Sequence, residues 1–193
     1  HDLPGAFAQR SHVRRGFEMR QHHIAVAVVM VYLGGGEHGL ILRYSGHTKA
    51  PTMNNLISLI GAPTDIGAGT RGASMGPEAL RVAHLVPVLQ GLGLQVLDRG
   101  NLSGPANPWL APVDGYRHLD EVVAWNRAVH EAVHGELQIG RLPILLGGDH
   151  CLGIGSISAV ARHCRDTGKK LRVLWLDAHA DFNTRDRKST RLN

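Results

Sequence analysis

The sequence has few cysteines, few aromatic residues and no long apolar run, and each shortage excludes a class of protein. Only two of its 193 residues are cysteines, Cys151 and Cys164, and they are not spaced as a CxxC pair. Neither a disulfide framework nor a zinc knuckle is therefore indicated, and we expect a reducing, cytoplasmic environment. Because no apolar run approaches the ~18 residues of a membrane span, a membrane protein is not predicted either.

Positive charge is concentrated at the two ends of the chain. The formal net charge is +5, but residues 53–184 hold eleven Lys and Arg against twelve Asp and Glu. Residues 1–52 and residues 185–193 each carry a net +3. Aromatic residues, which would form a stacking platform for bases, do not alternate with these charges, so we expect no nucleic-acid partner.

The chain changes character near residues 53 and 184. Residues 1–52 are rich in His and Arg, and their one apolar run lacks the small-residue cleavage site of a secretory signal. We expect this stretch to be a non-native or disordered leader, with Met53 as the natural start. Residues 185–193 have no periodicity and no core positions, and we expect a non-native, disordered tail. One folded domain is predicted between them.

Strand-like and helix-like segments alternate between residues 53 and 184, which is typical of an α/β protein with a parallel sheet. One predicted helix opens at Gly76-Pro77-Glu78, with proline in its first turn, and is disturbed at Pro87. The other predicted helices span 117–138 and 153–165, and the predicted strands span 56–60, 94–97, 142–146 and 171–176. The helical spacing of apolar residues predicts core positions in both of these helices, at Leu119, Val122, Val123, Val129, Ala132 and Val133 and at Ile154, Ile157, Val160 and Ala161.

Polar residues follow directly after the last two predicted strands. Gly147-Gly148-Asp149-His150 follows one strand, and Asp177, His179 and Asp181 alternate after the next. Alternating residues of an extended chain share one side, and a right-handed crossover brings both motifs to the same sheet edge. Carboxylates and imidazoles suit Mn²⁺ or another hard divalent ion. We favour a metal site over a polar loop, because three ionisable groups at the mouth of a buried strand are costly without a cation.

Other candidate sites are weaker. His130 and His134 lie one helical turn apart, but no acid separates them as in HExxH, so a solvated pair is favoured over a metal site. Cys151 has no identifiable base, and we expect a small buried residue rather than a nucleophile. The stretch 61–72 lacks GK[ST]. Its last six residues, Gly67 to Gly72, have the GxGxxG spacing but do not follow directly after a predicted strand, so we expect a loop that lines a site. A nucleotide-binding domain remains an alternative, with Asp98 as its one candidate acid.

GGDH at 147–150 and DAHADFNT at 177–184 resemble the first two metal motifs of the ureohydrolase family. The stretch GAPTDIGAGTRGASMGPEALR at 61–81 is closer to arginases than to agmatinases. The resemblance covers about residues 53–184 and implies a three-layer α/β/α fold with a parallel sheet, arginase-like. It also implies a two-manganese site that hydrolyses the guanidinium of L-arginine to L-ornithine and urea. At full length, the resemblance implies a homo-oligomer, either a trimer or a hexamer.

The resemblance implies a role for each motif residue. His150 would bind one manganese ion and His179 the other, with Asp177 bridging both. Asp181 would complete the first metal and, as the catalytic residue, orient the bridging hydroxide. Asn183 would hold the α-carboxylate of the substrate.

Part of the family's site is not found in the 193 residues. No two aspartates are separated by a single residue, so the second carboxylate pair of the family, Asp-x-Asp, is missing. The Gly-Asn-Leu-His-Gly-like loop and the downstream acids that grip the substrate are missing too. We therefore expect an incomplete fold, about half of the metal site and no activity of the chain by itself. The alternatives are an agmatinase or formiminoglutamase of the same family, or an inert α/β fragment.

Overall fold

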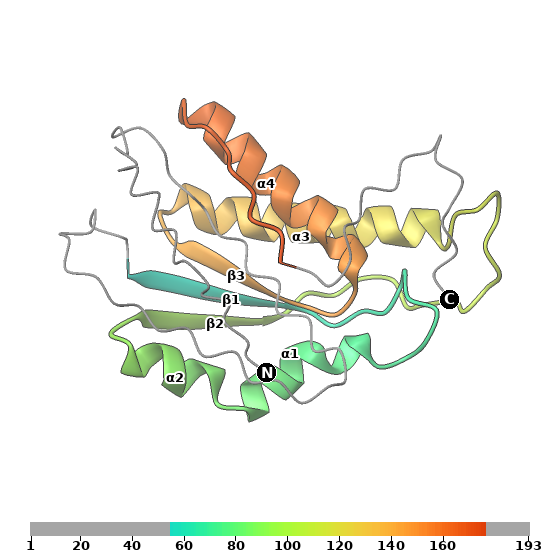
Figure 1. The fold of residues 1–193 in the computed structure, drawn as a ribbon, viewed down its shortest axis with the longest axis horizontal. Helices are drawn as coiled ribbons and strands as arrows, with labels where there is room; N and C mark the ends of the chain where they lie inside the picture. Colours follow the sequence, from blue (N-terminus) through green and yellow to red (C-terminus); the bar gives the residue numbers. More distant parts are fainter. Residues whose placement is uncertain (1–54, 177–193) are drawn as a thin grey trace, which may run out of the picture.

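The computed structural model describes residues 55–176 (Figure 1). The predicted leader 1–52, with the proposed start Met53, and the predicted tail 185–193 lie outside the described residues. The same holds for four of the predicted site residues, Asp177, His179, Asp181 and Asn183.

Three parallel strands form the sheet, in the order β2-β1-β3 (Figure 1). β1 spans Leu56–Ala62, β2 spans Gln95–Asn101 and β3 spans Leu142–Gly147. The central strand β1 is apolar almost throughout and buried from Ile57 onward, as a strand covered on both faces must be. Three of the four predicted strands are confirmed, and each of these three continues beyond its predicted end.

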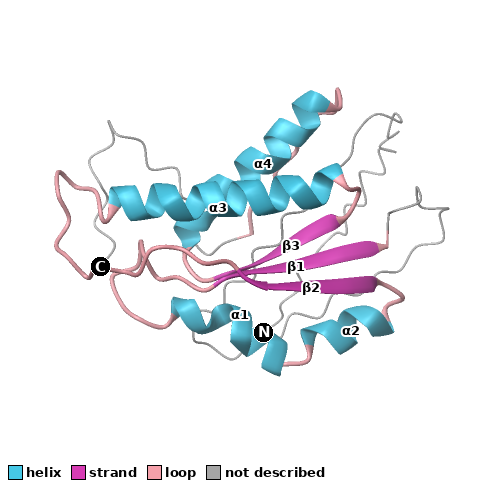
Figure 2. Cartoon of the chain, turned by 180° about the vertical axis from the view of Figure 1, so that it is seen from behind, coloured by secondary structure: helices cyan, strands magenta, loops and turns pink. Residues whose placement is uncertain are grey.

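Helices cover both faces of the sheet (Figure 2). The long helices α3 (Leu119–Gln138) and α4 (Gly153–Asp166) lie on one face. The short helices α1 (Gly76–Val82) and α2 (Leu85–Gly91) lie on the other. This is the predicted three-layer α/β/α arrangement with a parallel sheet.

The first predicted helix is in fact two helices. The chain breaks at His84, whose backbone is left-handed with φ 60° and ψ 35°. Pro87 lies in the first turn of α2, where its missing N–H removes no helical hydrogen bond. The expected disturbance therefore occurs before Pro87, because this proline lies in the first turn of a helix instead of ending one.

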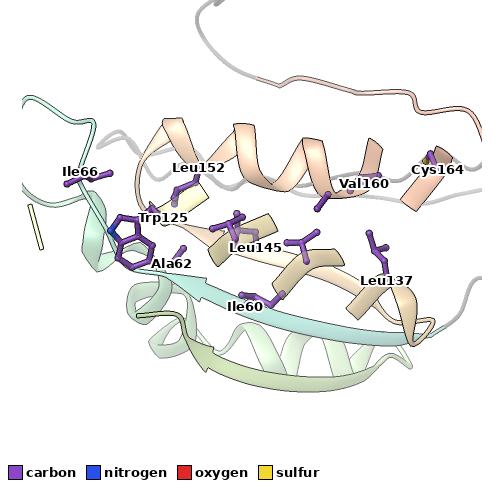
Figure 3. Packing of buried hydrophobic residues seen from close by; sticks show 12 residues of the cluster. Ile60, Ala62, Ile66, Trp125, Leu137, Leu145, Leu152, Val160 and Cys164 are labelled. Atoms are coloured by element: carbon purple, nitrogen blue, oxygen red, sulfur yellow. The ribbon is translucent and has the colours of Figure 1, made fainter. Parts of the chain in front are cut away.

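The main core fills the space between the sheet and the two long helices. Trp125 closes one end of it, and its indole N–H donates to the Pro105 carbonyl oxygen at 2.9 Å. A smaller cluster on the other face joins Ile57, Leu59 and Leu146 to apolar residues of α1 and α2. The residues of the main cluster that Figure 3 labels are Ile60, Ala62, Ile66, Trp125, Leu137, Leu145, Leu152, Val160 and Cys164.

The apolar stripes of the long helices are only partly buried. Val129 and Val133 of α3 are buried as predicted, whereas Leu119 and Val123 are exposed. In α4 the predicted core residue Ile154 is also exposed. The small residues that follow Ile154 are buried instead, because α4 approaches α3 so closely that a Cβ on Gly155 would lie 2.5 Å from the Asn126 carbonyl oxygen.

Residues 171–176 do not form the predicted fourth strand. They are not part of the three-stranded sheet, and Val173, Leu174 and Leu176 are 50%, 69% and 79% exposed. From the end of α4 the segment runs back toward the start of that helix (Figure 1). A parallel strand is stable only when a neighbour accepts its backbone hydrogen bonds and both its faces are covered. Within residues 55–176 the apolar run has neither, so its composition alone does not make it a strand.

Candidate metal centre

Three connections meet at the carboxyl edge of the sheet, one after each strand. Residues 63–72 follow β1, residues 102–118 follow β2, and the GGDH turn follows β3. Figure 2 shows the two longer loops gathered at one end of the sheet. Ligands of open parallel sheets bind at this edge, so the predicted site-lining loop 61–72 lies where a site is expected.

The GGDH turn packs directly on the first of these loops. A Cβ on Gly148 would overlap the Thr64 carbonyl oxygen and lie 2.9 Å from the carbonyl oxygen of Ala73. Only glycine allows so close an approach of two backbones. The two glycines of the motif are thus explained in part by packing, and the turn that carries His150 is fixed against the loop.

His150 is the one predicted metal ligand that lies among the described residues. It begins the short 3-10 helix His150–Leu152, and its side chain is exposed. Its ring meets that of Trp175 edge to face, with centroids 5.3 Å apart and the planes at 78°. Since Trp175 is two residues before Asp177 in the sequence, the chain leading to the second motif returns to the first. The placement of the second motif itself stays a prediction.

The two polar side chains of the GGDH motif differ in whether they can bind a metal ion. An exposed imidazole on a fixed turn at the carboxyl edge suits a divalent ion. The carboxylate of the neighbouring Asp149 is buried, and each of its oxygens accepts a backbone N–H. His150 is therefore the group of this motif that fits a metal. Within residues 55–176, no group of three or more His, Cys, Asp or Glu side chains is arranged to hold an ion.

Hydrogen bonds from distant residues brace the loop after β1. The Asp65 carboxylate accepts from the Gly72 N–H and the Ser74 hydroxyl, each at 3.1 Å. Asn107 donates to the Asp65 carbonyl oxygen at 2.7 Å, and His118 Nδ1 lies 2.8 Å from the Ile66 carbonyl oxygen. Sequence reasoning missed Asp65, Asn107 and His118 because no local pattern marks them.

Cys151 is not suited to nucleophilic chemistry. It is half-buried and packs against the main core. Burial, together with the nearby Asp149 carboxylate, raises the pKa of the Cys151 thiol to about 12. Because the thiolate is the reactive form, a packing role fits this residue better.

The histidine pair of α3 was predicted to be solvated, but His134 is not. The rings of His130 and His134 stack with centroids 5.9 Å apart, and His134 is buried. His134 Nε2 lies 3.6 Å from Asp166 Oδ2, and His130 Nδ1 lies 3.0 Å from the Ser158 hydroxyl. The prediction was wrong for His134 because the contact between α3 and α4 covers it.

Asp98, the acid that a nucleotide site would have needed, serves another purpose. Arg81 donates to it from Nε at 2.7 Å and from a terminal nitrogen at 2.9 Å. These bonds hold the pKa of the Asp98 carboxyl below its usual value. The pair ties α1 to β2, so Asp98 is explained as a structural partner.

The sequence profile of the arginase family matches residues 55–193. The chain belongs to the arginase family. This arginase-family chain is 39% identical over 132 residues to an arginase of Brevibacillus brevis, a match that covers 68% of the chain and 43% of that protein. It is 40% identical over 127 residues to an arginase of Brucella melitensis, covering 65% of the chain and 41% of that protein. The arginase-family chain therefore spans about two fifths of the length of these relatives.

Solved structures place the fold in the same family. The arginase of Bacillus caldovelox aligns with a TM-score of 0.52 at 36% identity, covering 56% of this chain and 37% of that one. The predicted ureohydrolase resemblance and the incomplete arginase-like fold are thus confirmed. In the described part of this arginase-family chain, no helix is long and apolar enough to cross a membrane.

Proposed function

We propose that the sequence encodes the amino-terminal part of a manganese-dependent arginase, which hydrolyses the guanidinium of L-arginine to L-ornithine and urea. The observation that carries the proposal is the placement of His150. The turn that bears it packs on the loop carrying the arginase-like signature, and its ring touches Trp175 just before the second motif. Family membership supports the reaction class.

The two motifs together supply the proposed ligands. His150, Asp177 and Asp181 would hold one manganese ion, and His179 the other, with Asp177 shared between them. When bound, two such ions would lower the pKa of a water so that it can act as a nucleophile at neutral pH. They would also neutralise the carboxylates around them. Asp181 would also accept a hydrogen bond that orients the attacking water toward the guanidinium carbon. Addition of this water, followed by cleavage of the C–N bond as the ornithine nitrogen takes up a proton, would give L-ornithine and urea.

Asn183 is proposed to select the substrate. Its amide would donate to the α-carboxylate of L-arginine, a group that agmatine lacks. A site built to hydrogen-bond a substrate group rejects an analogue without it, because its polar atoms are left unpaired. L-Arginine is therefore preferred over agmatine, and an agmatinase or formiminoglutamase is the second candidate.

The 193-residue chain itself is proposed to be inactive. Its sequence has no Asp-x-Asp pair to complete the two-metal site. We further propose that the complete enzyme works in the cytoplasm as a homo-oligomer, a trimer or a hexamer. Its partner is a small guanidino substrate, and no membrane or nucleic acid takes part.

Urea release from L-arginine and from agmatine tests these proposals. The assay compares the 193-residue chain with a longer chain in which the Asp-x-Asp motif of the family follows residues 55–184. We expect activity only in the longer protein, with a preference for L-arginine, and its loss in Asp181→Asn even where the metal is retained. Preference for agmatine would overturn the choice of substrate, and robust activity of the 193-residue chain would overturn the half-site argument.

A further inference from the structure

The carboxylate of Asp149 joins two segments that are far apart in the sequence. Its side chain is buried, and Oδ1 accepts from the Cys151 N–H at 3.0 Å, which caps the short helix that begins with His150. Oδ2 accepts from the Gly67 N–H at 2.6 Å, across 82 positions of sequence. Capping needs only the first of these bonds. The second therefore calls for another explanation.

The absence of a side chain at Gly67 leaves room for this carboxylate to approach the backbone. A Cβ on Gly67 would lie 3.1 Å from both carboxylate oxygens of Asp149, closer than ordinary contact allows. An N–H bond to a carboxylate is stronger than one to a neutral acceptor. The loop and the turn are thus joined by a short, charge-assisted bond as well as by the backbone packing at Gly148.

The loop on the far side of this bond is itself anchored. The Ile66 carbonyl oxygen can only accept, so Nδ1 of His118 carries the proton that bonds to it at 2.8 Å. His118 Nε2 lies 3.1 Å from both the backbone nitrogen and the carbonyl oxygen of Leu110. Through His118, the loop after β2 holds the loop after β1 one residue before Gly67. A fixed loop can hold the turn in place, which a mobile loop could not.

We propose that Asp149 is a positioning residue. Its two hydrogen bonds join the loop 63–72 to the turn that bears His150, and so they determine the position of the His150 imidazole. The inference rests on the proposed function, in which His150 is a metal ligand. Groups that orient a metal ligand typically change affinity by about 10–100-fold when they are replaced.

Asp149→Asn separates positioning from capping. Asparagine caps helices as well as aspartate does and has the same shape. With its oxygen on the Cys151 N–H, however, its NH₂ group faces the Gly67 N–H, and that bond is lost. The control is Glu136→Gln, which alters another buried carboxylate near the amino ends of β1 and β3, away from the site.

Two readouts on the 193-residue chain need no metal. We expect Asp149→Asn to speed hydrogen exchange of the Gly67 amide at least about tenfold, since an amide released from its bond exchanges freely. We also expect it to move the His150 Cε1–H resonance, and Glu136→Gln to leave that resonance in place. An unchanged resonance and exchange rate in Asp149→Asn would overturn the inference, as would an equal change in both variants.

A Mn²⁺ titration followed by EPR is the third readout. The Kd is expected to rise about 10–100-fold in Asp149→Asn and to change little in Glu136→Gln. If the wild-type chain bound no Mn²⁺, the proposed metal function would fail, and the two metal-free readouts would still decide the role of Asp149. If the wild-type chain binds and Asp149→Asn binds equally well, the positioning role is refuted.

Discussion

His150 and Trp175 meet edge to face, with ring centroids 5.3 Å apart. The two residues are separated by α4, so this contact shows the crossover bringing the chain back to the GGDH turn (Figure 1). The sequence places Asp177 two residues further on. The contact is therefore the structural basis for expecting both motifs to share one site.

Trp175→Leu tests this contact. The ring current of the indole acts on the His150 Cε1–H, so the resonance should move when the ring is removed. An aromatic pair contributes about 0.5–1.5 kcal/mol, and less where it is partly exposed, so we expect the free energy of unfolding to fall by at most about 1 kcal/mol. Trp109→Leu, which removes an indole that packs on Arg71 instead, is the control. Equal spectra for His150 in wild type and Trp175→Leu would contradict the contact.

Glu136 should make stability depend on pH. Burial alone would raise the pKa of Glu136, but the Ser58 hydroxyl at 2.6 Å, Arg99 at 2.8 Å and Arg141 at 3.8 Å outweigh it and lower the pKa. The unfolded chain therefore binds the proton more readily than the folded one. The stabilisation that the Glu136 carboxylate contributes is fully present above pH 4.5, its ordinary pKa. This stabilisation is lost as the pH falls through the lowered pKa of the folded state.

Glu136→Gln should accordingly destabilise the fold by about 1–2 kcal/mol at pH 7, since hydrogen bonds to a charged group are weakened. Below the lowered pKa the wild type and the variant should converge, because both then carry a neutral side chain. Urea unfolding at pH 7 and at several values below 4.5 gives the comparison. A constant difference across this range would contradict the assignment.

Two glycine replacements should have opposite effects. Gly148→Ala would place its Cβ against the Thr64 carbonyl oxygen, and overpacking of this kind costs about 1–3 kcal/mol. Gly135→Ala lies within α3 with nothing within 4 Å of the added Cβ, so it should stabilise by about 0.5–1 kcal/mol. Thermal unfolding of both variants checks the signs. Tolerance of alanine at 148 would show that the turn and the loop are not tightly packed.

The exposed segment before the second motif should promote self-association of the 193-residue chain. Leu174 and Leu176 are 69% and 79% exposed, and exposed apolar side chains close together in a segment favour association. Sedimentation velocity should show species larger than a monomer at micromolar concentration, and Leu174→Glu with Leu176→Glu should reduce them. Val88→Glu, at an exposed apolar site of α2, is the matched control. A monomeric wild type would refute this reasoning.

The sequence predicted what depends on local pattern. The apolar run of β1, the glycine turn before His150 and the periodicity of α3 identified the parallel sheet and the place of His150 at its carboxyl edge. Residues 171–176 have the same apolar pattern as β1, yet they form no strand in the described part. Burial of a strand depends on the neighbours that cover it, and composition does not reveal them.

The hydrogen bonds around the site depend on contacts that no local pattern carries. Asn107 and His118 reach the loop after β1 across 42 and 52 positions of sequence. Similarly, Gly155 rather than Ile154 faces α3, because the close approach of the two helices selects a small residue. Which residues form these long-range contacts depends on the path of a distant part of the backbone, and local sequence patterns do not specify that path.

The most direct test of the metal centre is an EPR-monitored Mn²⁺ titration of the 193-residue chain and of His150→Asn. The account predicts that the wild-type chain binds Mn²⁺ at one principal site, held by His150 with Asp177 and Asp181. Because the replacement removes the imidazole ligand, the Kd should rise at least about tenfold while the fold is retained. Equal affinity in wild type and His150→Asn, or two tight sites in the wild-type chain, would contradict the account.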